Sequence, residues 1–257
     1  MRIAYDIIGN KEKAVALLDV NTKNPEKAAK EIMKRHKNVK SVLQKLAERK
    51  DVYRLYPCKL ILGDKNTEVV HTEYNYKLKI KPQKAYFSPR EATERQRIAK
   101  MVEPREKILV MFSGVCPYPI AILKKEHLVD KIYAVEVNPD AHKYALENLK
   151  LNRAEKKIIP VLGDVRDVKI SEKFDRIIMP LVEKAIEFLD VAFKYSKKGT
   201  IIHLYGLSEY KEGSYGLEEK VKDIAKKFNV KYKIVGKQRV LPYAPRIMKI
   251  RLDIKIL

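Results

Sequence analysis

Three residues, each at the end of a short apolar run, have the types and the order needed to hold a nucleoside-like ligand. They are Gly114, Glu136 and Asp164. A glycine lets the backbone approach a ligand closely. A carboxylate after the second run can accept hydrogen bonds from both hydroxyls of a ribose, and one after the third run suits an adenine amino group. Together the three residues predict a site for a nucleoside-containing cofactor.

Each of these residues also has a simpler interpretation when it is taken alone. Gly114 can be a turn glycine, Glu136 a helix-capping or solvated acid, and Asp164 a turn residue. Taken together and in this order, they match class I S-adenosylmethionine-dependent enzymes. A pyrophosphate dinucleotide fits less well, because G-x-G-x-x-G is absent and fewer backbone amides can approach phosphates.

Short apolar runs alternate with helical segments through the later part of the chain. This alternation predicts a mainly parallel sheet with helices on both faces. Earlier β-forming segments and a helix over 24–36 predict a small α+β unit. The fold class is therefore α/β, with a small α+β domain over 1–75 and a Rossmann-like domain over 76–257. Two late strands over 230–257 form a hairpin, whereas 39–47 could extend the preceding helix or form a strand and a helix.

The chain carries 55 Lys and Arg against 33 Asp and Glu, a formal net charge of +22. Such a surplus favours a polyanionic partner, since Lys and Arg make most phosphate contacts. A thermophilic composition is the alternative explanation of this surplus. Such a composition raises the Glu content together with the Lys content, whereas here the acidic residues are far fewer than the basic ones. Cys58 and Cys116 lack metal-binding spacing and predict buried thiols, so no metal is expected. Without a signal-peptide layout or an apolar run of about 18 residues, we expect a cytoplasmic protein with no membrane partner.

Six segments resemble the archaeal and eukaryotic tRNA guanine-N1 methyltransferases that act at position 37, beside the anticodon. They are YFSPREATERQRIAK, MFSGVCPY, IYAVEVNPDAHKYALENLKLN, DRIIMPLVEKAIEFL, IIHLYG and YAPR. The resemblance covers nearly the whole chain. It implies a monomer that takes S-adenosylmethionine as methyl donor, uses no metal and binds the anticodon stem-loop of a tRNA. Relatives in this group make wyosine-type bases at the same nucleotide.

The resemblance also implies chemical roles. Glu94 matches the general base on guanine N1, and Arg54 matches the arginine that stabilises the reacting guanine. N1 is a poor nucleophile until its proton leaves, so a carboxylate can remove that proton while a guanidinium stabilises charge on O6. Without the resemblance, Glu94 would be a helix-surface acid paired with Arg90, and Arg54 a phosphate contact or a solvated side chain.

The predicted site residues fall into three sets. The catalytic set is Glu94, Arg54 and Pro180. The cofactor set is Tyr86, Ser88, Pro89, Phe112, Ser113, Gly114, Val115, Glu136, Val137, Asn138, Gly163, Asp164, Val165 and Pro180. The RNA set, expected to contact phosphates rather than bases, is Arg35, Lys37, Lys40, Arg95, Arg239 and Arg246, with His36 beside them. His203 is interpreted as a packed histidine rather than a catalytic one.

Four features depart from the family pattern. Val110 stands where an acid is usual, and Cys116 where a second loop glycine is usual. We expect the family's N-terminal accessory domain to have no counterpart. The simple guanine methyltransferases carry Asn-Leu-Pro after a later strand, where this chain has Pro180. Proline offers neither a side-chain amide nor a backbone N–H, and a branch resembling the wyosine C7-methylating enzymes tolerates it there.

Three functions stay open from the sequence. The leading one is methyl transfer to N1 of guanosine 37, with C7 of a tricyclic wyosine precursor as a second candidate acceptor. A sister branch transfers the aminocarboxypropyl group of the same cofactor, which the retention of Glu94 and Arg54 disfavours. The third is a tRNA-binding protein without catalysis, suggested by Val110, Cys116 and Pro180.

Overall fold

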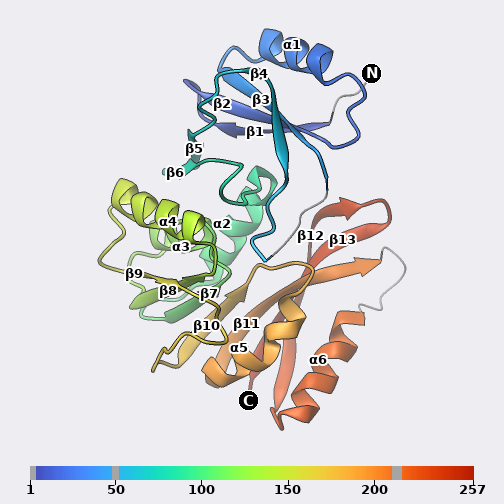
Figure 1. Cartoon of the computed structure of the whole chain (residues 1–257). Helices are drawn as coiled ribbons and strands as arrows, with labels where there is room; N and C mark the ends of the chain where they lie inside the picture. Colours follow the sequence, from blue (N-terminus) through green and yellow to red (C-terminus); the bar gives the residue numbers. More distant parts are fainter. Residues whose placement is uncertain (1–3, 48–51, 210–215) are drawn as a thin grey trace. The chain divides into compact units, whose positions relative to one another are not determined.

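The computed structural model describes residues 4–47, 52–209 and 216–257. The chain divides into two compact units, each with its own sheet and its own apolar core (Figure 1). The first unit consists of Met1–Ala92, Gly114–Pro117 and Asn138–Arg153. The second unit consists of Thr93–Ser113, Tyr118–Val137 and Ala154–Leu257.

The first unit contains a four-stranded sheet with the order β1-β2-β3-β4. Its strands are β1 (Tyr5–Gly9), β2 (Ala14–Leu18), β3 (Val39–Lys45) and β4 (Cys58–Gly63). β2 and β3 pair in parallel, and the other two pairs are antiparallel. Helix α1 (Pro25–Arg35) connects the parallel pair, as a parallel crossover requires, and buries Ala28, Ala29 and Ile32 in the core. The choice left open for 39–47 is settled, because the segment contains a strand.

A two-stranded sheet in the same unit pairs β5 (Val69–Glu73) with β6 (Tyr76–Ile80) in an antiparallel hairpin. The turn between the two strands contains residues 74 and 75. The predicted domain boundary after residue 75 therefore falls beside this turn and would separate two paired strands. The division into two domains itself stays a prediction.

Two asparagines on helix α4 (Pro139–Asn152) bind the backbone of β6. Asn148 accepts a hydrogen bond from the Lys79 amide (2.6 Å) and donates one to the Lys79 carbonyl (3.1 Å). Asn152 makes the same pair of bonds with the amide (3.1 Å) and carbonyl (2.6 Å) of Lys77. Because a side-chain amide has one acceptor and two donors, each asparagine satisfies a strand residue as a third strand would.

The second unit contains a seven-stranded sheet with the order β12-β13-β11-β10-β7-β8-β9. The strands are β7 (Lys107–Met111), β8 (Lys131–Glu136), β9 (Ile158–Leu162), β10 (Phe174–Met179), β11 (Ser196–Glu209), β12 (Tyr232–Ala244) and β13 (Ile247–Ile256). Neighbours from β9 to β11 pair in parallel, and β13 is antiparallel to both β11 and β12. The predicted parallel sheet and late hairpin are confirmed. Strand order reverses at β7, and ligands of such sheets bind beyond the carboxyl ends of the strands there.

Helices and short 3-10 turns precede β7 or connect the later strands. They are η1 (Pro89–Glu91), α2 (Ala92–Met101), α3 (Pro117–Lys125), η2 (Ala185–Phe188), α5 (Leu189–Tyr195) and α6 (Gly216–Lys227). Figure 1 shows α5 and α6 beside β11, which both contact. The central strands are mostly apolar, as strands covered on both faces must be, and the side chains of Ile108 and Ile177 are fully buried. Within the described residues, no helix has both the length and the apolar character needed to cross a bilayer.

Candidate cofactor and catalytic site

The loop after β7 has an alternating left-handed backbone. Phe112, Gly114 and Cys116 have φ angles of 59°, 55° and 66°. Glycine adopts this conformation freely, whereas each of the other two residues stores strain of about 1–3 kcal/mol. The left-handed angle at Cys116 gives a physical reason for the glycine that the family uses there. Backbone strain of this kind is concentrated at binding and catalytic sites.

Two features of this loop fit a polar cofactor. The Ser113 hydroxyl is buried and has no hydrogen-bond partner among the described residues, while its amide donates to the Val135 carbonyl (2.8 Å). A buried hydroxyl is normally satisfied, so a ligand group is a suitable partner for it. At Gly114, an added Cβ would meet, among the residues that the structure describes, only the Tyr86 carbonyl, at 3.8 Å. The loop therefore combines an unused polar group with an uncrowded glycine.

Glu136 and Gly163 lie at adjacent strand ends. The Gly163 amide donates a hydrogen bond to the Glu136 carbonyl (2.9 Å), which fixes the loop after β9 to the end of β8. Gly163 has a φ of 148°, and a Cβ there would come within 2.8 Å of the Val168 side chain. The structure thus brings these two predicted cofactor residues together, and a glycine is required at the second of them.

Asp164 is held by a neighbour that the sequence analysis did not single out. Both of its carboxylate oxygens accept from Arg166, at 2.9 and 2.5 Å. The hydrogen bond from Arg166 lowers the pKa of Asp164. The Arg166 guanidinium also lies 4.9 Å from the centre of the Phe188 ring, which packs edge-on against Phe112 at 4.9 Å. A carboxylate has spare lone pairs, so Asp164 retains capacity for an additional donor.

Asn138 has a structural task in its own unit. Its side-chain oxygen caps α4 by accepting from the amides of Asp140 (2.9 Å) and Ala141 (3.4 Å). Its side-chain nitrogen donates to the Lys84 carbonyl (2.9 Å). The N-cap alone is worth about 1 kcal/mol. The Asn138 side chain is therefore engaged by protein groups, and a cofactor contact would use the backbone of this residue.

The remaining cofactor candidates lie in several segments. Tyr86, Ser88 and Pro89 are half-buried before α2, next to Phe87, whose ring packs edge-on against His71 at 5.0 Å. Val115 and Val165 are buried, whereas Val137 and Pro180 are half-buried. Among the residues that the structure describes, no group of three or more His, Cys, Asp or Glu could hold a metal ion.

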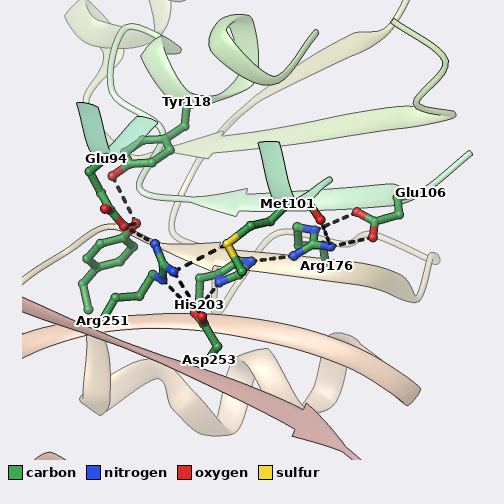
Figure 2. A network of polar contacts seen from close by, with 9 residues as sticks. Glu94, Met101, Glu106, Tyr118, Arg176, His203, Arg251 and Asp253 are labelled. Carbon is green, nitrogen blue, oxygen red and sulfur yellow. Dashed lines mark hydrogen bonds and ion pairs between the residues drawn. The ribbon is translucent and has the colours of Figure 1, made fainter. Parts of the chain in front are cut away.

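Glu94 lies on α2 and is only 1% exposed (Figure 2). Its Oε1 accepts hydrogen bonds from the Tyr205 hydroxyl (2.8 Å) and from Arg251, and its Oε2 lies 3.3 Å from the Arg97 guanidinium. The alternative interpretation, a surface acid paired with Arg90, is wrong, because Arg90 pairs with an acid of the first unit's sheet. Glu94 is a buried carboxylate held by three donors.

The contacts continue from Arg251 as a chain of charged groups (Figure 2). Arg251 donates to both oxygens of Asp253, at 2.7 and 3.1 Å. His203 lies between Asp253 (2.6 Å) and Arg176 (2.7 Å), and Arg176 donates twice to Glu106, at 2.7 Å each. A guanidinium has no acceptor, so His203 Nε2 accepts and Nδ1–H donates to Asp253. His203 is a packed histidine, as its sequence position suggested.

Burial sets the protonation of this chain of groups. Burial lowers the pKa of His203, although its hydrogen bond to Asp253 opposes the shift. Burial raises the pKa of Asp253, but the hydrogen bond and charge of His203 and the bonds from Arg251 outweigh it and lower the pKa to about 2. The neutral histidine and ionised aspartate agree with the donor and acceptor assignment above.

We expect His203→Asn to make stability less sensitive to mild acid. Unfolded histidine binds a proton below about pH 6.5, whereas buried His203 resists it, so wild-type stability falls as the pH drops from 6.5 towards 5. One such group contributes up to about 1.4 kcal/mol per pH unit. Urea unfolding at pH 7.5, 6.5 and 5.5 measures the slope, with exposed His127→Asn as control. Equal slopes in all three proteins would contradict the expectation.

The other two catalytic candidates lie on other segments of the chain. Arg54 is half-buried in the first unit, before β4, and has a left-handed backbone with a φ of 57°. Pro180 directly follows β10 and is half-buried. Proline lacks an N–H, so its carbonyl and that of Met179 are the polar groups that this strand end offers. Their catalytic roles stay predictions.

Five of the six RNA candidates have exposed side chains. They are Arg35, Lys37, Lys40, Arg239 and Arg246. The prediction for the sixth, Arg95, is corrected. It is only 2% exposed, and a guanidinium buried inside the protein does not reach a phosphate. We remove it from the RNA set.

The sequence analysis missed the partners of Glu94, although β13 contains a pattern that indicates them. Lys249, Arg251 and Asp253 alternate with Ile250 and Leu252, and all five are buried. Alternate residues of a strand share one face, so three charged side chains lie on one buried face. Buried charges require partners, and this pattern was the available sign of an internal polar network.

The strand order, the strained loop after the first parallel strand and the carboxylates after the next two strands define a class I methyltransferase fold. The TRM5/TYW2 methyltransferase domain matches residues 69–235. The chain belongs to this family.

Its relatives include proteins with assigned substrates and a solved RNA complex. The chain is 40% identical to tRNA (guanine(37)-N(1))-methyltransferase Trm5b of Pyrococcus abyssi, over 98% of this chain and 74% of the relative. It is similar to a structure described as the complex of aTrm5 and tRNALeu, with a TM-score of 0.85, 32% identity and coverage of 100% and 73%. A structure of M. jannaschii TYW2 with AdoMet gives a TM-score of 0.74, 28% identity and coverage of 98% and 99%.

Proposed function

We propose that the protein transfers the methyl group of S-adenosylmethionine to N1 of guanosine 37 in a tRNA. The observation that carries the proposal is Glu94, a carboxylate buried on α2 and held by Arg251 and Tyr205, in a chain of the TRM5/TYW2 family. Trm5b of P. abyssi, 40% identical, is named for this reaction. The net charge of +22 suits a polyanionic substrate.

S-adenosylmethionine would be held by the residues around the loop after β7. Ser113 offers a hydroxyl that no described residue binds, Gly114 an approachable backbone, and Glu136 a carboxylate for ribose hydroxyls. Asp164, whose partner Arg166 lies against the Phe188 ring, would serve the adenine amino group. When bound, the sulfonium supplies an electrophilic methyl group. The protein's own contribution is to align the acceptor nitrogen with it and to exclude water.

On the substrate side, Glu94 takes the proton from guanine N1 and Arg54 stabilises negative charge on O6. Exposed Arg35, Lys37, Lys40, Arg239 and Arg246 contact phosphates of the tRNA, including its anticodon stem-loop. Such contacts position the RNA without reading its sequence. The chemistry at N1 therefore depends on Glu94 and Arg54, and the affinity for tRNA depends on these five exposed basic residues.

Pro180 bears on which base is accepted. It presents one backbone carbonyl oxygen where an asparagine side chain would offer both a donor and an acceptor. Methylation at C7 of a tricyclic wyosine precursor would need other polar contacts than methylation at N1. We therefore include this precursor as a second candidate acceptor.

Nucleoside mass spectrometry tests the proposal. The protein is incubated with S-adenosylmethionine and either a tRNA with unmodified guanosine 37 or one with the tricyclic precursor. A methyl group on plain guanosine supports N1 chemistry, and methylation of the tricyclic base alone makes Pro180 a mark of specificity. An aminocarboxypropyl adduct without methylation would replace the proposal with the sister reaction. No product from either tRNA would leave a tRNA-binding role.

We expect Glu136→Gln to weaken S-adenosylmethionine binding about 10- to 100-fold, since a hydrogen bond to a charged group contributes about 1.5–3 kcal/mol. Glutamine keeps the size of the side chain but loses the charge and one of the two acceptors that a ribose diol uses. Calorimetric titration measures the affinity, and exposed Glu12→Gln is the matched control. Equal affinity in both variants would remove Glu136 from the cofactor site.

A further inference from the structure

The two oxygens of Glu94 have different environments. Oε1 accepts from Tyr205, whose hydroxyl is buried, and from Arg251, whose side chain is only 5% exposed. Within the described part of the chain, the partner of Oε2 is Arg97, at 3.3 Å. The Arg97 side chain is 42% exposed, and ion pairs with such exposed groups are weak and exchangeable. One oxygen is thus bound internally, and the other has a partner that a substrate can displace.

Arg251 is itself immobilised. Two of its nitrogens donate to the two oxygens of Asp253. One of these nitrogens, Nη2, also contacts the Met101 sulfur at 3.5 Å (Figure 2). Asp253 in turn accepts from His203. A guanidinium fixed in this way cannot follow a rotating carboxylate, so it confines Glu94 to one orientation before any substrate arrives. Donors fixed in advance need no reorganisation during the reaction.

We infer that Arg251 and Tyr205 are positioning residues that bind Oε1 of Glu94 and so present Oε2 as the proton-accepting oxygen. The inference rests on the proposed function, because it assigns the partners of the proposed base. Neither residue touches the substrate in this scheme. Their effect on methyl transfer acts through the orientation of Glu94.

The proton and electron balance of methyl transfer agrees with these separate roles of Oε1 and Oε2. Oε2 of Glu94 takes the N1 proton, the N1 lone pair forms a bond to the methyl carbon, and the carbon–sulfur bond breaks with its electrons on sulfur. Glu94 ends as a neutral acid with its proton on Oε2. Its Oε1 is then a carbonyl oxygen that still accepts from Tyr205 and Arg251, so both donors stay satisfied before and after transfer.

The test measures single-turnover methylation of a tRNA with unmodified guanosine 37 at saturating S-adenosylmethionine. We expect Arg251→Met to lower the rate about 100-fold, the effect of misplacing a reacting group by about 1 Å. In separate steady-state assays, the KM values for tRNA and S-adenosylmethionine should change by less than about twofold, since substrate contacts are intact. Arg251→Lys, which keeps a donor and the charge, should recover part of the rate.

Two further variants separate positioning from general stability. Glu106→Gln weakens the same network at its far end, beside Arg176, and should lower thermal stability while leaving the rate unchanged. Tyr205→Phe removes one hydroxyl and should lower the rate about tenfold. If Arg251→Met fails to fold, the rate of Tyr205→Phe alone tests the inference.

The inference and the proposed function can fail separately. If the wild-type protein methylates guanosine 37 but Tyr205→Phe and folded Arg251→Met keep the wild-type rate, the inference is overturned and the function stands. A rate loss shared equally by Glu106→Gln also overturns it, since a structural role would then suffice. If the wild-type protein forms no methylated product, the proposed function fails before any variant is compared.

Discussion

The Glu94→Gln variant is expected to methylate guanosine 37 about 10²- to 10⁴-fold more slowly in a single turnover. The glutamine oxygen can still accept hydrogen bonds from Tyr205 and Arg251, so the side chain keeps its place. Its nitrogen, which replaces Oε2, is a donor and cannot take the N1 proton. The loss therefore isolates proton removal from the packing around α2.

Rapid quenching of the reaction with a tRNA carrying unmodified guanosine 37 measures this rate. Equilibrium titration of the same tRNA should give wild-type affinity, because Glu94 is buried and has no phosphate contact. Glu103→Gln, an exposed acid just beyond the end of α2, is the matched control. An unchanged single-turnover rate in Glu94→Gln would remove Glu94 from the base role.

The Gly63→Ala variant is expected to lose roughly 3 kcal/mol or more of unfolding free energy. Gly63 ends β4 with a φ of +97°, and an added Cβ would lie 2.0 Å from the Lys40 carbonyl oxygen and 2.9 Å from its carbon. Both atoms belong to the backbone of β3, so relief would require the β3–β4 pair to separate. Strain and a backbone clash act together at this position.

Gly199→Ala separates these two causes. Gly199 has nearly the same angle, with a φ of +91°, but a Cβ there would have no atom of the described residues within 4 Å. Only the left-handed strain applies, so we expect a loss of about 1 kcal/mol. Urea unfolding of both variants measures the difference. Equal losses would mean that the β3–β4 pair accommodates the methyl group without cost.

The fold was predictable because it follows from local patterns. Apolar runs alternating with helical segments predict a parallel sheet, and the seven-stranded order with its late hairpin agrees. The domain boundary was harder to place, because nothing local distinguishes the β5–β6 turn from a linker. Tyr74, in that turn, has a left-handed backbone that its residue type does not indicate.

The site was predictable only in part, because its main contacts are remote in the sequence. Glu94 and Arg251 are 157 positions apart, and no periodicity relates them. Arg95 was misplaced for a related reason: α2 buries Glu94, Arg95, Ile98 and Ala99 together, a wider arc than one apolar stripe. Charged residues on such a face resemble surface residues until their partners are known.

The two asparagines of α4 fix the number of residues that can separate them in the helix and separate their partners in β6. Four residues of a helix advance about 6 Å, and two residues of a strand advance about 6.6 Å. Asn148 and Asn152 can therefore meet Lys79 and Lys77 together only because these spacings nearly coincide. Inserting one residue between either pair would move one asparagine off its strand partner. In this segment, change by substitution is tolerable away from the asparagines, whereas insertion and deletion are not.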